Sequence, residues 1–91
     1  MVLQLFSVYD SALGAYGRPF SSPSKGTGIR SFTDEVNHVA PENPLNRHPD
    51  DYKLFHLGSF NDKTGIISPP ENSKMPIQLV TATEVLIHNP T

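Results

Sequence analysis

The chain has 91 residues and a formal net charge of −2, which allows one domain with one modest core and argues against a broad basic surface. It has no cysteine, which excludes disulfides and thiolate metal sites and fits a reducing cytoplasm. Its apolar runs are too short to cross a bilayer, and its N-terminus lacks the pattern of a secretory signal. We therefore expect a single domain over residues 1–91 with no membrane contact, and we leave the structure of residues 69–91 open.

The first 23 residues predict a strand followed by an irregular segment. Val2 to Tyr9 is rich in β-branched and aromatic residues, apolar on both faces, and predicts a buried strand. Residues 10–17 contain several small residues, two of them glycines. Residues 18–23 contain two prolines, which lack ladder donors, so an edge strand or a strand-like loop is expected there.

Residues 25–38 are predicted to form the main helix, because apolar residues recur at helical spacing at Ile29, Phe32 and Val36. Ser24 or Thr27 could cap its start, and Pro41 ends it. The next segment, residues 43–50, is rich in turn-forming residues and predicts a connecting loop, pinned by Leu45.

Residues 51–68 predict the β-hairpin around which the chain is organised. Its first arm carries large apolar residues on both faces, which is typical of a central strand: Tyr52, Leu54 and Phe60 on one face, Phe55 and Leu57 on the other. Residues 61–65 form its loop, and Ile66 starts the return. Further on, residues 77–81 read as a strand, whereas Thr81 to Glu84 also matches a capping box. We favour a strand to about Val80 followed by a short helical turn.

The expected fold is α+β: a small antiparallel sheet of three to four strands covered by one main helix. The predicted core comprises Leu5, Phe6, Val8, Ile29, Phe32, Val36, Leu54, Phe55 and Leu57.

Two short clusters have a functional interpretation and a simpler structural one. Two glycines, two hydroxyls and two cations between Ser24 and Arg30 could hold a phosphate at the helix start, but Gly26 and Gly28 are explained more simply by close packing of the helix on a strand. His48, Asp50 and Asp51 are better explained as a turn than as metal ligands. His56 is expected to be a satisfied core or edge histidine rather than a ligand. No catalytic motif is present, so we predict no enzyme activity, no cofactor and no metal.

Direct contact with nucleic acid would have to use a local patch. The span from Ser11 to Thr33 holds three cations and no carboxylate, and a 91-residue domain needs most of its eight aromatic residues in its core. The candidate DNA-binding residues are therefore Arg18, Lys25 and Arg30 for phosphates, with Tyr16 and Phe20 for base stacking.

Three blocks occur together in order: LQLFSVYDSALGAYGRPF, GIRSFTDEVN and HPDDYKLFHLGSFNDKTGII. In this pattern the chain resembles the small nonstructural protein of gokushovirus-type microviruses, which are tailless phages with single-stranded DNA genomes. The resemblance implies an accessory protein of the host bacterial cytoplasm. It would act in viral DNA synthesis or packaging by binding single-stranded DNA or viral replication or packaging proteins, and it carries no catalytic residue.

The alternative function is a homodimeric interaction or structural module that does not touch nucleic acid. Self-association is expected because strands with two apolar faces exceed what one helix can cover, and a homodimer is the simplest closed form. The opposing expectation is that the C-terminal segment, residues 77–87, covers the second face within one chain.

Overall fold

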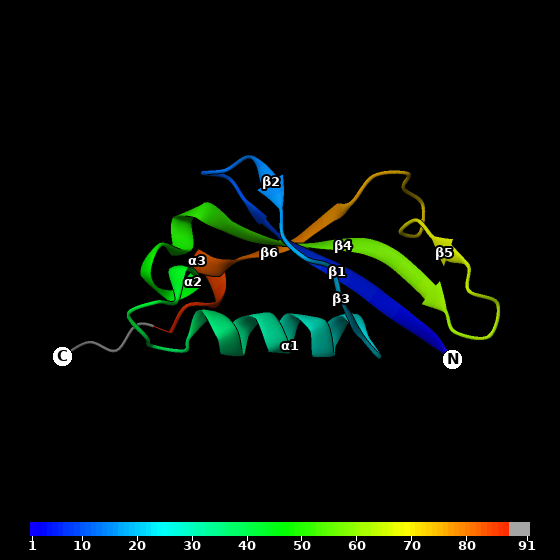
Figure 1. The fold of residues 1–91 in the computed structure, drawn as a ribbon, viewed down its shortest axis with the longest axis horizontal. Coiled ribbons are helices and arrows are strands. Elements are labelled where there is room, and N and C mark those ends of the chain that lie inside the picture. Colours follow the sequence, from blue (N-terminus) through cyan, green and yellow to red (C-terminus); the bar gives the residue numbers. More distant parts are fainter. Residues whose placement is uncertain (88–91) are drawn as a thin grey trace.

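A computed structural model describes residues 1–87 and has the predicted α+β class (Figure 1). Its sheet is antiparallel but has six strands rather than three to four. The elements in order are β1 (Val2–Asp10), β2 (Ala15–Tyr16), β3 (Phe20–Ser22), α1 (Lys25–Val36), α2 (Pro44–Arg47), the 3-10 turn η1 (Pro49–Asp51), β4 (Tyr52–Asn61), β5 (Ile67–Ser68), β6 (Ile77–Thr81) and α3 (Ala82–Val85). No helix within residues 1–87 has the length and apolar character needed to cross a membrane.

The six strands form four rows. β1 and β4 pair along their whole length, from Val2 opposite Asn61 to Asp10 opposite Tyr52. β2 and β3 both pair with β1, and β5 and β6 both pair with β4, so each outer row is interrupted. Proline explains the interruptions, because Pro19 and Pro69 lack an N–H for the ladder. β4 is therefore central, as predicted.

The predicted hairpin is confirmed between β4 and β5. The side chain of Asn61 orders its turn: Oδ1 accepts hydrogen bonds from the backbone N–H of Lys63 at 2.9 Å and of Thr64 at 3.3 Å. Gly65 closes the turn with φ of 75° and donates its N–H to the Asn61 carbonyl at 2.7 Å. Turn chemistry that is local in sequence thus sets this register.

Helix α1 starts at the predicted cap and packs on the sheet. Ser24 Oγ accepts the N–H of Thr27 at 3.2 Å, and the Ser24 N–H donates to Thr27 Oγ1 at 3.1 Å, completing a capping box. The fully packed core consists of Phe6, Phe32, Val36, Leu54 and Ala82. Four of the nine predicted core residues are thus fully buried, and Val8 and Ile29 pack against them. The prediction was wrong for Leu5, Phe55 and Leu57, which are partly buried on the opposite face of the sheet, because alternation along β1 and β4 turns them away from Phe6 and Leu54.

The segment after α1 is not the loop that was predicted, because it forms α2 and η1. The buried side chain of Asn43 stabilises α2: its Nδ2 donates to the carbonyls of Glu35 and His38, and its Oδ1 accepts the N–H of Leu45 at 3.2 Å. Leu45 packs against the core as expected. At the C-terminal end, the strand and helical turn are confirmed, with Thr81 and Glu84 forming the capping box of α3.

A β-bulge in β4 changes which face its later residues occupy. His56 lies opposite Phe6 and Gly58 opposite Leu5, so Leu57 is an extra residue without a partner in β1. The placement of Phe60 with Tyr52 and Leu54 was therefore wrong. Paired with Leu3, Phe60 shares the face of Phe55 and Leu57.

All three helices pack on the face of the sheet that carries Phe6. Gly28 of α1 lies against the Phe6 ring, Ala82 of α3 belongs to the same core, and Leu45 of α2 packs beside it. We call the opposite face, on which Leu3, Leu5, Tyr9, Phe55 and Phe60 lie, the open face. No helix of the described part of the chain covers it.

Candidate functional site

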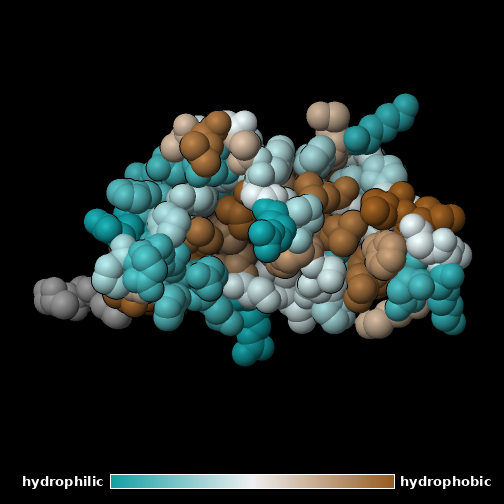
Figure 2. Space-filling model, in the orientation of Figure 1, coloured by the Kyte–Doolittle hydropathy of each residue, from teal (hydrophilic) through white to brown (hydrophobic). Residues whose placement is uncertain are grey.

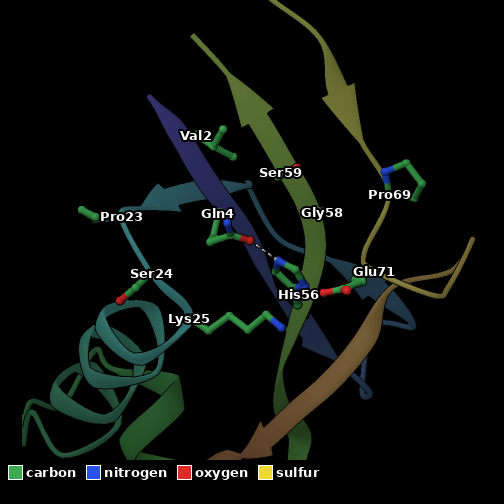
Figure 3. Close-up of a pocket in the computed structure, with 10 residues that line it drawn as sticks. All are labelled: Val2, Gln4, Pro23, Ser24, Lys25, His56, Gly58, Ser59, Pro69 and Glu71. Carbon is green, nitrogen blue, oxygen red and sulfur yellow. Dashed lines mark hydrogen bonds between the residues drawn. The ribbon is translucent and has the colours of Figure 1, made fainter.

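A groove of about 520 Å³ lies on the helix side of the sheet, beyond the first turn of α1 (Figure 3). Gln4, His56 and Ser59 of β1 and β4 form its floor. Lys25 and Glu71 approach from opposite walls, one from α1 and the other from the connection between β5 and β6. The groove therefore joins segments that are distant in sequence.

His56 is the most constrained polar group of the groove. The residue is only 4% exposed, and its Nε2 donates a hydrogen bond to Gln4 Oε1 at 2.8 Å. Burial lowers the pKa of His56 below its ordinary value, and the Lys25 charge lowers it further, although a hydrogen bond with the Gly58 backbone opposes the shift. The ring is thus held neutral, which agrees with the expectation of a core histidine.

This environment predicts a pH dependence of folding. The unfolded chain takes up a proton on His56 near the ordinary value of 6.5, while the folded chain resists it. The stability that the neutral ring contributes is therefore complete above that value and is lost as the pH falls. We expect the free energy of unfolding to fall between about pH 7.5 and pH 5.5, and to fall less in His56→Gln, which lacks the ring that resists protonation in the folded chain.

Chemical denaturation of both proteins at the two pH values measures this difference. His38→Gln, which replaces an exposed histidine, is the matched control and should retain the wild-type dependence. An equal loss of stability in wild type and His56→Gln would contradict the assignment.

The groove can hold a small polar group, but it does not contain a reactive pair. His56 Nε2 is occupied by Gln4, and Ser24 Oγ serves as the helix cap. Within residues 1–87 no three His, Asp or Glu side chains come together as a metal site would need. The cluster of His48, Asp50 and Asp51 lies in the α2 to η1 turn, as its structural interpretation predicted.

The residues predicted to contact DNA do not form one surface. Lys25 and Arg30 are both exposed. Lys25 lies on the sheet-facing stripe of α1 and lines the groove, whereas Arg30 is five positions on and about 140° around the helix. Arg18 is exposed in the link between β2 and β3. Phe20 is not a free stacking residue, because its ring stacks on Phe6 with centroids 5.4 Å apart.

Tyr16 belongs instead to an aromatic cluster that the sequence did not reveal. Its ring contacts Tyr9 at a centroid distance of 4.9 Å and Phe55 at 5.3 Å, both edge to face. Tyr9 lies opposite Tyr16 of β2 and opposite Lys53 of β4. The side chains of Tyr9, Tyr16 and Lys53 therefore share the open face with Phe55. Tyr16 is 47% exposed. The two-residue strand β2 creates this cluster. The only sequence signal for β2 is the turn-forming stretch that precedes it, residues 10–14.

Comparison with known proteins identifies the family of the chain. A family model described as "Phage ORF5 protein" matches residues 3–85. No curated protein and no solved structure matches. Because the family match covers nearly all of the sequence, the chain belongs to the Phage ORF5 protein family and is a bacteriophage protein.

Proposed function

We propose that this phage protein is a nonstructural accessory factor of viral DNA synthesis or packaging that binds single-stranded DNA weakly through the Tyr9, Tyr16 and Phe55 cluster. The phage family supports the general role, and the sequence blocks favour a gokushovirus-type microvirus and the cytoplasm of its host. The single observation that carries the DNA proposal is the partly exposed aromatic cluster on a sheet face without a helix.

The physical argument concerns stacking. Every unpaired base has a flat π face, and an antiparallel sheet with aromatic side chains on an uncovered face is a recurrent platform for single strands. Lys53 shares the face, and Arg18 follows Tyr16 by two residues, so cations are available for the neighbouring phosphates. The net charge of −2 limits the long-range attraction, which makes binding weak.

The proposal predicts that Tyr16→Ala weakens binding of a labelled single-stranded oligonucleotide by roughly ten-fold, because one stacked base contributes about 1–3 kcal/mol. Lys53→Gln should lower the slope of log affinity against log salt by about 0.7, the value for one phosphate on a single strand. Lys63→Gln, which removes an exposed lysine from the β4 to β5 turn, is the matched control and should behave as wild type.

Fluorescence anisotropy at two salt concentrations gives both quantities. The triple variant Arg18→Ala/Lys25→Ala/Arg30→Ala tests the three cations that the sequence predicted to contact phosphates. Because Lys25 and Arg30 lie on different sides of α1, we expect its effect to come mainly from Arg18. No binding by wild type at low salt, or equal binding by Tyr16→Ala, would overturn direct contact. Recovery of replication or packaging proteins with the chain from infected cells would then favour a protein partner.

A further inference from the structure

The link between β2 and β3 is longer by one residue than the part of β1 that it faces. Tyr16 of β2 lies opposite Tyr9 of β1. Phe20 of β3 lies opposite Phe6, which leaves residues 17–19 opposite only two residues of β1. Residues four apart in a regular strand share one face of a sheet. The extra residue acts as a bulge, which leaves Tyr16 on the open face and turns Phe20 to the helix side, where its ring stacks on Phe6.

A buried hydroxyl group anchors this bulge. Ser7 follows the alternation of β1 onto the open face, and it is fully buried although no helix of residues 1–87 covers that face. Its Oγ donates a hydrogen bond to the Gly17 carbonyl at 2.7 Å. The Gly17 N–H donates to the Val8 carbonyl at 2.8 Å. Both backbone groups of the residue between Tyr16 and Arg18 are therefore bonded to β1.

The C-terminal segment leaves the aromatic cluster accessible. β6 extends the sheet as part of its outer row, pairing with β4 from Lys53 to His56. α3 then packs on the helix side, where Ala82 is fully buried. The expectation that residues 77–87 cover the second face of the sheet is therefore wrong.

Exposed apolar side chains are not confined to the cluster. Figure 2 shows them at other places on the surface, among them the end of the molecule that carries β5. Exposure alone therefore does not distinguish Tyr16 from its surroundings. Its attachment does, because the residue that follows it is fixed to the neighbouring strand by the Ser7 hydroxyl.

We propose that Ser7 is a positioning residue of the DNA-binding site, whose hydroxyl holds the Gly17 link so that the Tyr16 ring keeps its place for a base to stack on. The inference rests on the proposed binding of single-stranded DNA by the aromatic cluster. Strand β2 pairs with β1 at only two positions, so one further hydrogen bond is a large part of what holds it. A ring that is already in place loses less conformational freedom when a base binds than a ring on a mobile link.

Fluorescence anisotropy with a labelled single-stranded oligonucleotide measures the effect on binding. Ser7→Ala should weaken binding by roughly two- to ten-fold, the range that the loss of one hydrogen bond gives. The double variant Ser7→Ala/Tyr16→Ala should bind no more weakly than Tyr16→Ala, because Ser7 acts through the Tyr16 ring.

Ser22→Ala is the matched control. Ser22 is also a buried serine of the sheet, and its hydroxyl is hydrogen-bonded to Thr27 Oγ1 on the helix side. Its replacement should lower stability about as much as Ser7→Ala does, yet it should leave DNA binding as in wild type. Ser7→Cys, in which a weak sulfur donor replaces the hydroxyl, should weaken binding as Ser7→Ala does and serves if the alanine variant fails to fold.

Two measurements without DNA report on the position of Tyr16. The chain has three tyrosines and no tryptophan, so its near-UV circular dichroism reports mainly on tyrosine packing. Ser7→Ala should reduce this signal, because the contact between Tyr9 and Tyr16 loosens. Hydrogen exchange at the Gly17 amide should become roughly ten-fold faster. Ser22→Ala should change neither.

The outcomes separate this inference from the proposed function. No binding by wild type at low salt would overturn the proposed function and the role of Ser7 with it. Where wild type binds, equal binding by Ser7→Ala, or an additive loss in the double variant, would overturn the role of Ser7 alone. An equal loss in Ser22→Ala would trace the effect to general stability and overturn it too. Unchanged tyrosine dichroism and Gly17 exchange in Ser7→Ala would overturn it whether or not DNA binds.

Discussion

Replacing Gly28 with alanine should destabilise the fold by about 2–4 kcal/mol, whereas the same change two residues earlier should stabilise it. A Cβ at Gly28 would lie 2.4 Å from Phe6 Cζ and 2.8 Å or less from two further atoms of that ring. Phe6 is fully buried in the centre of the core, so its ring cannot move aside without displacing Phe32 and Val36. Overpacking therefore outweighs the gain of about 1 kcal/mol in helix propensity.

Gly26→Ala is the matched control in the same helix turn. The nearest atom to a Cβ at Gly26 is Ser24 Oγ, at 3.9 Å, so the methyl group meets no clash and the propensity gain of about 1 kcal/mol should appear in full. Urea denaturation of the two variants and wild type measures both effects. If both substitutions stabilised the protein, the close approach of α1 to β1 would be wrong. If Gly26→Ala also destabilised it, that glycine would have a role that packing does not explain.

The two glycine substitutions test whether the start of α1 is a phosphate site or a point of close packing. The contact of Gly28 with Phe6 supports the structural explanation, tight entry of the helix against a strand, for one of the two glycines. Lys25 remains on the groove wall, and the Ser24 hydroxyl satisfies one of the free N–H groups of the first turn. Gly28 is thus explained without a phosphate.

The parts of the fold that the sequence predicted are those with local signals. The cap at Ser24, the turn at Asn61 to Gly65 and the capping box at Thr81 each depend on residues within four positions of one another. Helical spacing likewise placed Phe32 and Val36 in the core. Short-range rules of this kind need no knowledge of the rest of the chain.

The features that were missed depend on pairing between distant segments. The bulge at Leu57 appears only when β4 is aligned with β1, and it exchanged the faces of Phe60 and its neighbours. The aromatic cluster needs β2 to bring Tyr16 beside Phe55, 39 residues away in the sequence. A stretch of three cations without a carboxylate likewise could not show that a helix would separate Lys25 from Arg30.

Replacing Gly58 with alanine should cost about 3–5 kcal/mol or detach β5 from the sheet. The new Cβ would lie 2.0 Å from the Ser68 carbonyl oxygen and 3.2 Å from Pro69 Cα, and neither backbone atom can move while β5 stays paired. The φ of 142° is itself strained for any residue with a side chain. Relief therefore requires breaking the pairing of Ser59 with Ser68.

Gly65→Ala separates the steric contact from the backbone strain. Gly65 also has a positive φ, 75°, but no atom lies within 4 Å of its Cβ position. It should cost only about 1–2 kcal/mol, the conformational term alone. Urea denaturation gives the two losses, and hydrogen exchange at Ile67 and Ser68 reports whether β5 has detached. Equal losses in the two variants would mean that the contact with Ser68 carries no energy.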